Sequence, residues 1–222
     1  MTKDEVRQRI VEVGIVPVVR AASAEQAVLA AEAVAEGGIP IVEITMTVPG
    51  AVDVISRLSR SIGRQVLVGA GTVLDAETAQ RCLDAGAAFL VSPGFDLETV
   101  QLAQRRETLI MAGALTPTEA ITAFKAGSDF VKIFPCGNVG GPAYIKALKA
   151  ALPQIPMVPT GGVNLATAAD FLRAGAAALG IGGELVSRAD LEAGNSAALT
   201  AAARRYAAIV RETREGDRAH VA

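Results

Sequence analysis

The lysine at position 132 lies in a sequence context that favours a catalytic role. It lies within residues 129–135 (DFVKIFP), a short apolar run ended by a proline, and this pattern predicts a buried strand. Because side chains alternate along a strand, Phe130, Lys132 and Phe134 share one face. Burying an ammonium group is costly, so a lysine in such a place tends to become a neutral amine. A neutral amine attacks carbonyl carbon, which is the first step of Schiff-base catalysis.

Two structural interpretations of this lysine remain open beside the catalytic one. Its ammonium group can reach water past the phenylalanines, or it can pair with a buried carboxylate. Glu43 is a second charged residue within a predicted apolar strand: it stands in the run 39–44 and shares a strand face with Thr45. A carboxylate there is either paired, with Lys132 or Arg20, or active in proton transfer. Lys132 and Glu43 together favour catalysis, because a nucleophilic lysine needs a proton shuttle to form and break a carbinolamine.

The composition narrows the classes of protein to consider. The chain has 222 residues, 51% of them apolar, and a net charge of −2, which suits one large α/β domain and gives no basic field for nucleic acid. No apolar run has the length of a membrane span, and residues 1–9 are too charged to open a signal peptide. We therefore expect a cytoplasmic protein with no membrane or nucleic-acid partner. Cys82 and Cys136 are far apart in the sequence and predict free thiols.

The single histidine limits the possible chemistry further. His220 lies two residues from the end of the sequence, in a polar segment. One histidine cannot supply a zinc site built on two or three histidines, and this one is badly placed for a Ser-His-Asp triad. We therefore expect a site made of lysine, carboxylates, hydroxyls and backbone groups, with no metal and no other cofactor.

Strand-like apolar runs alternate with helix-like segments along the whole chain. The predicted strands are residues 15–19, 39–44, 65–68, 88–91, 108–111, 129–135, 157–160 and 178–181. The predicted helices begin after capping residues such as Ser23 and Thr116 and mostly end at glycines. A long final helix, residues 196–214, precedes a charged tail, residues 215–222, which we expect to be disordered.

Eight strands alternating with helices predict an α/β fold, a single-domain (β/α)8 TIM barrel over residues 1–222. The alternative is an open, doubly wound sheet, which usually carries a Gly-x-Gly-x-x-Gly turn after its first strand. Residues 19–22 (VRAA) do not form such a turn. In a barrel, functional groups collect at the carboxyl ends of the strands, so the residues there become candidates for a site.

The predicted strand ends carry polar residues and glycines. They are Arg20, Glu43, Thr45, Gly71, Thr72, Ser92, Pro93, Lys132, Phe134, Thr160, Gly161, Gly162, Gly182 and Gly183. The glycine pairs after the seventh and eighth strands precede expected helices and leave bare N–H groups in the loops where this fold usually binds phosphate. Glycines also make tight turns and threonines also cap helices, so both interpretations stay open from the residues alone.

Six motifs, in order and spacing, resemble one known family. Over about residues 15–186 the sequence is similar to the class I 2-keto-3-deoxy-6-phosphogluconate (KDPG) and 4-hydroxy-2-oxoglutarate (KHG) aldolases. The motifs are residues 42–45 (VEIT), 69–73 (GAGTV), 91–94 (VSPG), 115–119 (LTPTE), 131–135 (VKIFP) and 159–163 (PTGGV). The resemblance implies a homotrimeric (β/α)8 barrel that cleaves KDPG to pyruvate and glyceraldehyde 3-phosphate, or KHG to pyruvate and glyoxylate.

The same resemblance implies roles for residues of this chain. Lys132 matches the Schiff-base lysine and Glu43 the general acid–base. The positions that hold the pyruvate portion are matched by Thr72, Pro93 and Phe134, with Thr160 beside them. The loops at the phosphate end are matched by Gly161, Gly162, Gly182 and Gly183.

Two positions depart from the family pattern. Many members carry an arginine four residues after the glutamate, where this chain has Thr47, and some carry a serine in the last phosphate loop, at the position matched here to Gly183. Both changes weaken the expected hold on a phosphorylated tail, and Arg20 is expected to supply a cation at the carboxylate end of the substrate. The candidate substrates are KDPG, its galactonate epimer and KHG. The alternatives are a phosphate-binding isomerase or synthase barrel and a non-catalytic barrel scaffold.

Overall fold

The structure, a computed structural model, describes residues 1–219 and side chains up to residue 216. Across these residues eight parallel strands form one sheet in the order β7-β6-β5-β4-β3-β2-β1-β8. They are β1 (Ile15–Val19), β2 (Ile41–Thr45), β3 (Leu67–Gly71), β4 (Phe89–Val91), β5 (Leu109–Ala114), β6 (Phe130–Ile133), β7 (Met157–Pro159) and β8 (Leu179–Ile181). A bridge between Thr160 and Gly180 brings the two edge strands together, so the sheet forms a nearly closed barrel.

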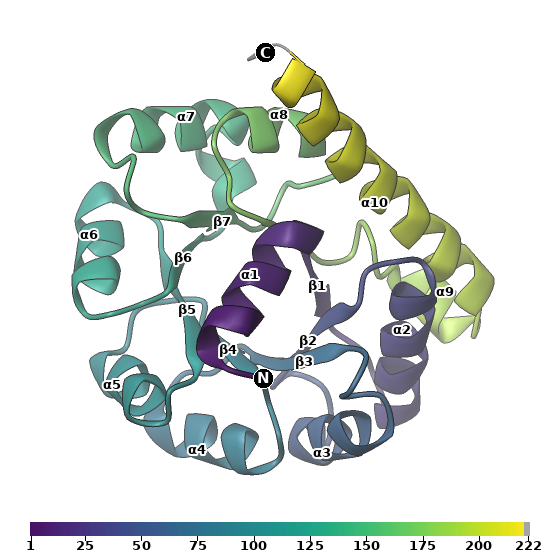
Figure 1. Cartoon of the computed structure of the whole chain (residues 1–222). Helices are drawn as coiled ribbons and strands as arrows, with labels where there is room; N and C mark the ends of the chain where they lie inside the picture. Colours follow the sequence, from purple (N-terminus) through teal and green to yellow (C-terminus); the bar gives the residue numbers. More distant parts are fainter. Residues whose placement is uncertain (220–222) are drawn as a thin grey trace.

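Helices surround this barrel and connect its strands (Figure 1). They are α2 (Ala24–Glu36), α3 (Ala51–Ser61), α4 (Ala76–Asp84), α5 (Leu97–Arg105), α6 (Pro117–Lys125), α7 (Pro142–Ala151), α8 (Ala168–Arg173), α9 (Arg188–Glu192) and α10 (Ser196–Ala219), with the 3-10 helix η1 (Cys136–Val139) after β6. Side chains at the N-cap fix several helix starts: Ser23, Asp75, Asp96 and Thr116 each accept a hydrogen bond from a backbone N–H three residues on. The predicted (β/α)8 barrel is confirmed.

The barrel has two apolar cores, one on each face of the sheet. The larger core packs the outer face against the surrounding helices. The smaller core fills the interior and includes Ile41, Leu67, Phe89 and Phe130, all less than 3% exposed. Because alternate residues of a strand face opposite sides, the same strands serve both cores.

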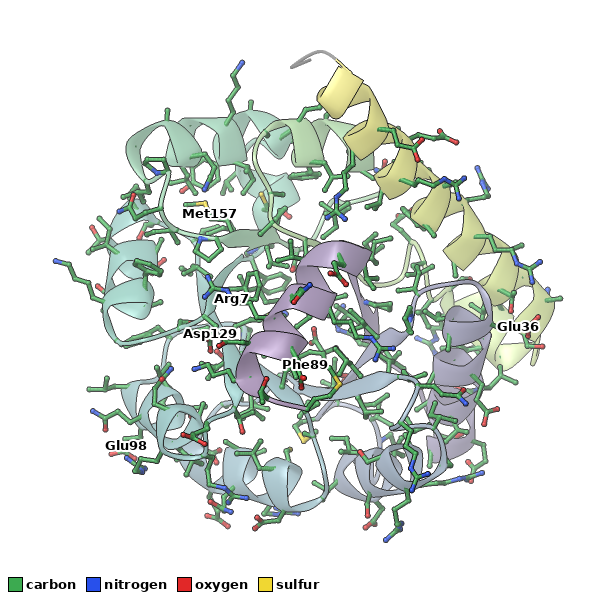
Figure 2. All side chains as sticks on the ribbon, in the orientation of Figure 1. Arg7, Glu36, Phe89, Glu98, Asp129 and Met157 are labelled. Atoms are coloured by element: carbon green, nitrogen blue, oxygen red, sulfur yellow. The ribbon has the colours of Figure 1, made fainter. Side chains whose placement is uncertain are left out.

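The helix α1 (Lys3–Val13) closes the amino-terminal end of the interior, where it lies across the ring of strands (Figure 1). Val6 and Ile10 enter the interior core from this helix. Lys3 forms a 2.9 Å ion pair with Asp129, directly before β6, and the Arg7 guanidinium lies 5.7 Å from the Phe130 ring centre. In Figure 2, Arg7 and Asp129 lie inside the ring of helices, whereas Glu36 and Glu98 lie at its rim.

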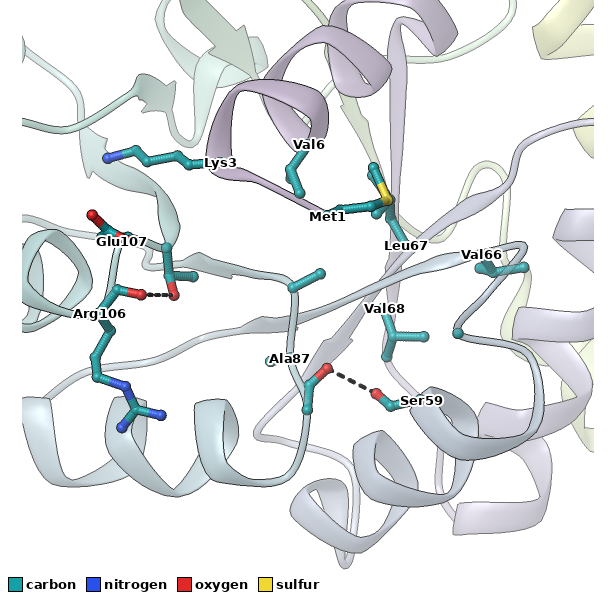
Figure 3. Close-up of a pocket in the computed structure, with 14 residues that line it drawn as sticks. Met1, Lys3, Val6, Ser59, Val66, Leu67, Val68, Ala87, Arg106 and Glu107 are labelled. Atoms are coloured by element: carbon teal, nitrogen blue, oxygen red, sulfur yellow. Dashed lines mark hydrogen bonds between the residues drawn. The ribbon is translucent and has the colours of Figure 1, made fainter.

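A cavity of about 320 Å³ lies at this amino-terminal end, beside α1 and far from the strand ends expected to carry function (Figure 3). Met1, Leu67 and Val68 form part of its wall. Its two cationic residues already have acidic partners, because Lys3 pairs with Asp129 and Arg106 pairs with Asp84. These two side chains therefore offer a ligand no unpaired positive charge.

Several boundaries differ from the sequence prediction. Strand β3 begins at Leu67 and runs through Gly71, and β5 continues to Ala114, because glycines expected in turns take part in the ladders. Helix α1 is not predicted at all. Helix α10 extends to Ala219, so residues 215–219 continue the helix and the prediction of a tail starting at 215 is wrong for them. The rest of that predicted tail, including His220, lies outside the described residues. Among the described helices, none combines the length and the apolar character needed to cross a bilayer.

Candidate active site

Lys132 and Glu43 meet across the barrel interior. Lys132 comes from β6 and Glu43 from β2, and three other strands separate these two in the order of the sheet. Their Nζ and Oε1 atoms are 3.8 Å apart, and their side chains are 5% and 2% exposed. The Lys132 Nζ also lies 5.5 Å from the centre of the Phe134 ring. An amine and a carboxyl group are therefore held together out of bulk water, the arrangement required for imine chemistry with an internal proton shuttle.

The Glu43 carboxyl group has an unused acceptor. Its Oε1 atom is buried and has no hydrogen-bond partner among the described residues. Burial raises the pKa of Glu43, and the positive charges of Lys132 and then Arg20 oppose this rise without cancelling it. A buried acceptor without a partner lowers the stability of the fold by about 1–3 kcal/mol. This oxygen therefore does not stabilise the fold and is open to a hydrogen bond from a ligand. A carboxyl group with a raised pKa keeps its acid form to a higher pH, which suits it to donate as well as accept a proton.

Three inward-facing glycines make room for the site. A Cβ atom added to Gly71 would lie closer than 3.0 Å to the Glu43 carboxylate, and one added to Gly180 would lie equally close to Thr160 Oγ1. An added Cβ at Gly113 would meet the backbone of Pro93 at less than 3.0 Å. The sequence prediction names Gly71 but misses Gly113 and Gly180. For Gly180 the available signal is a two-residue periodicity with Gly182, directly after β8, like that of Gly69 and Gly71 in β3. Gly113 has no such glycine partner in β5.

Replacing Gly71 with alanine is expected to displace the Glu43 carboxyl group. We expect kcat for aldol cleavage to fall about 100-fold, because misplacing a reacting group by about 1 Å has an effect of this size. The fold should survive, since Glu43 can rotate away, and far-UV circular dichroism checks this. Gly216→Ala, in the exposed last part of α10, is the matched control and should retain full activity. Unchanged kcat in Gly71→Ala would contradict this account of the glycine.

Residues expected to hold the pyruvate portion follow the carboxyl ends of β3, β4 and β6. Phe134 follows β6, and Pro93 packs its backbone against Gly113 of β5. Thr72 directly follows β3 and has a φ of 57°, a left-handed conformation that a β-branched residue rarely adopts. Ser92 fixes the loop that contains Pro93. Its Oγ donates to the Gly94 carbonyl at 2.6 Å and accepts a hydrogen bond from the Gly113 N–H at 3.3 Å.

The glycine pairs expected at the phosphate end lie in loops. Gly161 and Gly162 have φ angles of 84° and 79°, and the Gly161 carbonyl accepts a 2.8 Å hydrogen bond from the Gly137 N–H. The Gly182 carbonyl accepts hydrogen bonds from Leu185 and Val186, both 2.9 Å, in a single turn. The helices that follow these pairs begin several residues later, α8 at Ala168 and α9 at Arg188. An anion here would bind loop N–H groups, a nest, instead of a helix N-terminus.

Thr160 and Cys136 lie between the lysine and these loops. Thr160 is 4% exposed, and its carbonyl accepts a 2.9 Å hydrogen bond from the Cys136 N–H. Burial raises the pKa of the Cys136 thiol to about 11, so this thiol stays protonated at neutral pH and is a poor nucleophile. In the described part of the chain, His, Cys, Asp and Glu side chains form no group of three that could hold a metal ion.

Arg20, Thr45 and Thr47 gather where β1 and β2 end. Thr45 Oγ1 donates to the Val19 carbonyl at 2.9 Å and lies 2.6 Å from Thr47 Oγ1. The Arg20 Nη1 atom lies 3.3 Å from the position that a Cβ of Gly182 would take. The sequence predicts Arg20 at the carboxylate end of the substrate, but its guanidinium lies beside the β8 loop, at the end expected for phosphate.

Comparison with known proteins places this geometry in a family. The model of the KDPG and KHG aldolases matches residues 6–202. The chain belongs to this family. It is therefore an aldolase, a carbon–carbon lyase, and neither an isomerase or synthase barrel nor a non-catalytic scaffold.

The similarity to individual family members extends over most of the chain. A 2-dehydro-3-deoxy-phosphogluconate aldolase of Pseudomonas aeruginosa is 36% identical over 72% of this chain and 73% of its own length. A 2-dehydro-3-deoxy-6-phosphogalactonate aldolase of Escherichia coli K12 is 34% identical over 90% of this chain and 95% of its own length.

A solved structure of the KDPG aldolase from Legionella pneumophila extends the comparison to three dimensions. It has a TM-score of 0.83 and 28% identity, covering 89% of this chain and 96% of that chain. It contains pyruvate captured as a covalent carbinolamine intermediate. The aldolase described here thus shares its fold with a protein in which pyruvate forms that adduct.

Proposed function

We propose that this aldolase cleaves a 2-keto-3-deoxy sugar acid through a Schiff base on Lys132. The observation that supports this most directly is the buried Lys132–Glu43 pair, with 3.8 Å between Nζ and Oε1. A lysine on the inner face of a strand, beside a carboxyl group of raised pKa, has few functions other than carbonyl chemistry. The captured carbinolamine in the Legionella pneumophila structure, although a property of that protein, is consistent with this proposal.

The proposed reaction begins when the Lys132 amine attacks the C2 carbonyl carbon of the substrate. Glu43 protonates the carbinolamine hydroxyl, which leaves as water and gives the iminium. The ionised Glu43 then takes the proton of the C4 hydroxyl, the C3–C4 bond breaks, and the aldehyde leaves. The bonding electrons move into the iminium to form an enamine, which is protonated at C3 and hydrolysed to pyruvate and free lysine.

We propose KDPG as the principal substrate, with its galactonate epimer and KHG as the alternatives. The loops of Gly161, Gly162, Gly182 and Gly183 support a phosphorylated tail, because glycine-rich turns leave N–H groups open to an anion. A panel of these three compounds, assayed by pyruvate release, tests the choice. We expect the highest kcat/KM for KDPG, and a higher value for KHG would contradict it.

The charge of Glu184 modulates this preference, because Glu184 is exposed and directly follows Gly183 in the β8 loop. Replacing Glu184 with glutamine is expected to lower the KM for KDPG by roughly two- to fivefold, since a nearby anion repels the phosphate across water. The KM for KHG, which has no phosphate, should change less. Kinetics at two salt concentrations check the result, because screening should reduce the difference; an unchanged KM for KDPG at low salt would contradict it.

We also propose that the chain assembles as a homotrimer, as the resemblance implies. Light scattering should give a mass close to three copies of the 22.7-kDa chain, and a monomeric mass at micromolar concentration would contradict this. Its location in the cytoplasm stays a prediction from the sequence.

A further inference from the structure

Two sulfur atoms meet between the end of β2 and helix α4. The Cys82 thiol donates a weak hydrogen bond to the Met46 thioether, with 3.6 Å between Sγ and Sδ. Met46 directly follows β2 and is partly exposed, whereas Cys82 is fully buried. A thioether is soft and polarisable, and peroxides oxidise it to a sulfoxide. Of the two sulfur atoms, the one in Met46 is therefore accessible to a small oxidant in solution.

Met46 forms part of the wall of a cavity of about 380 Å³ between the start of α3 and helix α4. Ala51, Thr78 and Arg81 line the same cavity. Across the described residues, the exposed Arg81 side chain has no hydrogen bond and no ion pair within 4.0 Å; its charge acts on Asp75 from a longer distance. The cavity thus gives a hydroperoxide access to the thioether, and its arginine offers a donor to a sulfoxide oxygen.

The other three methionines of the chain are either shielded or far from the active site. Met111 and Met157 are 1% and 0% exposed, so a peroxide reaches neither of them without opening the fold. Met1 is exposed, but it lies at the amino-terminal end of the barrel. Burial raises the pKa of both cysteine thiols to about 11, so at neutral pH they stay protonated and react slowly with peroxides. Met46 is therefore the sulfur most open to oxidation near the carboxyl ends of the strands.

Backbone contacts connect Met46 to the Glu43 carboxyl group. The Met46 N–H donates to the Gly71 carbonyl at 2.8 Å, directly after the paired residues of β2 and β3. Gly71 packs so closely against Glu43 that an added Cβ would lie less than 3.0 Å from the carboxylate. The Met46 side chain packs against the outer apolar core, where a polar sulfoxide fits less well than a thioether. Oxidation of Met46 is therefore expected to displace the end of β2, and with it Gly71 and Glu43.

We propose that Met46 is a site of reversible oxidation by hydroperoxides, and that its sulfoxide slows the aldolase. The sulfur atom attacks the terminal oxygen of the peroxide, the O–O bond breaks, and the peroxide proton moves to the departing oxygen. Sulfur is oxidised by two electrons, and the hydroperoxide is reduced to an alcohol, or to water if it is hydrogen peroxide. The oxidation itself does not depend on which substrate the enzyme cleaves.

Hydrogen peroxide treatment of the whole chain, followed by peptide mass spectrometry, tests the site. We expect the peptide that contains Met46 to gain one oxygen atom at peroxide concentrations that leave Met111 and Met157 unmodified. Pyruvate release should slow about tenfold, because a shift of about 1 Å in a reacting group costs about 100-fold and we expect a smaller shift. Methionine sulfoxide reductase with its thiol reductant should restore the rate, and a thiol reductant alone should not. Oxygen gained first on a buried methionine, or full recovery with the thiol alone, would overturn the proposal.

Two substitutions separate Met46 from the exposed Met1. Leucine keeps the apolar volume and cannot be oxidised, so Met46→Leu should retain turnover within about twofold and lose none in peroxide. Met46→Gln brings a polar oxygen to the same place and should slow turnover about tenfold without peroxide, with circular dichroism confirming the fold. Equal peroxide sensitivity of Met46→Leu and the wild type would overturn the proposal. The mass gain on Met46 is measured without substrate, so its absence is distinguishable from failure of the proposed cleavage.

Discussion

Replacing Lys132 with alanine is expected to abolish aldol cleavage. Without the amine there is no iminium to accept the electrons of the C3–C4 bond, so kcat for KDPG should fall by at least about a thousandfold. The fold should remain, because alanine fits the interior space and removes a costly buried amine. A coupled assay of pyruvate release measures the rate, and circular dichroism with light scattering confirms the folded assembly.

Lys149 provides a matched control for this experiment. It is a second partly buried lysine, on α7, and desolvation lowers its pKa, but its Nζ donates to the carbonyls of Pro153 and Ile155 outside the barrel interior. Lys149→Gln should retain kcat within about twofold, even if stability decreases by the energy of these hydrogen bonds. Normal turnover in Lys132→Ala would mean that the chemistry runs through another group.

The second large effect is expected for Glu43→Gln. Glutamine keeps the shape of the side chain but cannot transfer a proton, so kcat should fall about 10²–10⁴-fold, the usual contribution of a general acid–base. Imine formation with pyruvate should slow but need not stop, because water can carry protons less efficiently. Rapid-quench trapping and steady-state kinetics separate the two effects.

The pH dependence provides an independent check on Glu43. Because burial raises its pKa, the wild-type carboxyl group loses its acid form at a higher pH than an ordinary glutamate. The ionisation of this group should therefore shape the pH profile of kcat above the range in which an ordinary glutamate titrates, and that limb should disappear in Glu43→Gln. Wild-type rates with an unchanged profile would remove Glu43 from the mechanism.

The buried Lys132–Glu43 pair costs stability, and its role in catalysis explains why it persists. An ion pair in a low-dielectric interior rarely stabilises a fold more than apolar residues of equal size, and Glu43 Oε1 is left without a hydrogen bond. Gly71, Gly113 and Gly180 add a further cost, because glycine weakens a strand. These features lie at the carboxyl ends of the strands, where a barrel carries its function, and function explains why their cost is tolerated.

The sequence predicts the barrel and the principal pair because both depend on local patterns. Apolar runs at regular spacing indicate the strands. The charged residues Lys132 and Glu43 stand out because they lie within these apolar runs. Their 3.8 Å separation cannot be predicted in this way, because it depends on how β2 and β6 face each other across a closed barrel. The same holds for Arg20, whose side chain points to the β8 loop only because β1 and β8 are neighbours.

Two other misses have local causes. Glycine usually signals a turn, so the glycines of β3 and β5 shorten the predicted strands, whereas here they give space to Glu43 and Pro93. Helix α1 is highly charged and buries only Val6 and Ile10, so its amphipathic signal is weak. Its capping box, Thr2 with Glu5, was the available sign of a helix start.

Borohydride reduction in the presence of pyruvate, followed by peptide mass spectrometry, tests the central claim most directly. We expect a reduced three-carbon acid attached to the peptide that contains Lys132, and to no other peptide. A protein that releases pyruvate from KDPG but gains no adduct, or gains it on a different lysine, would contradict the account.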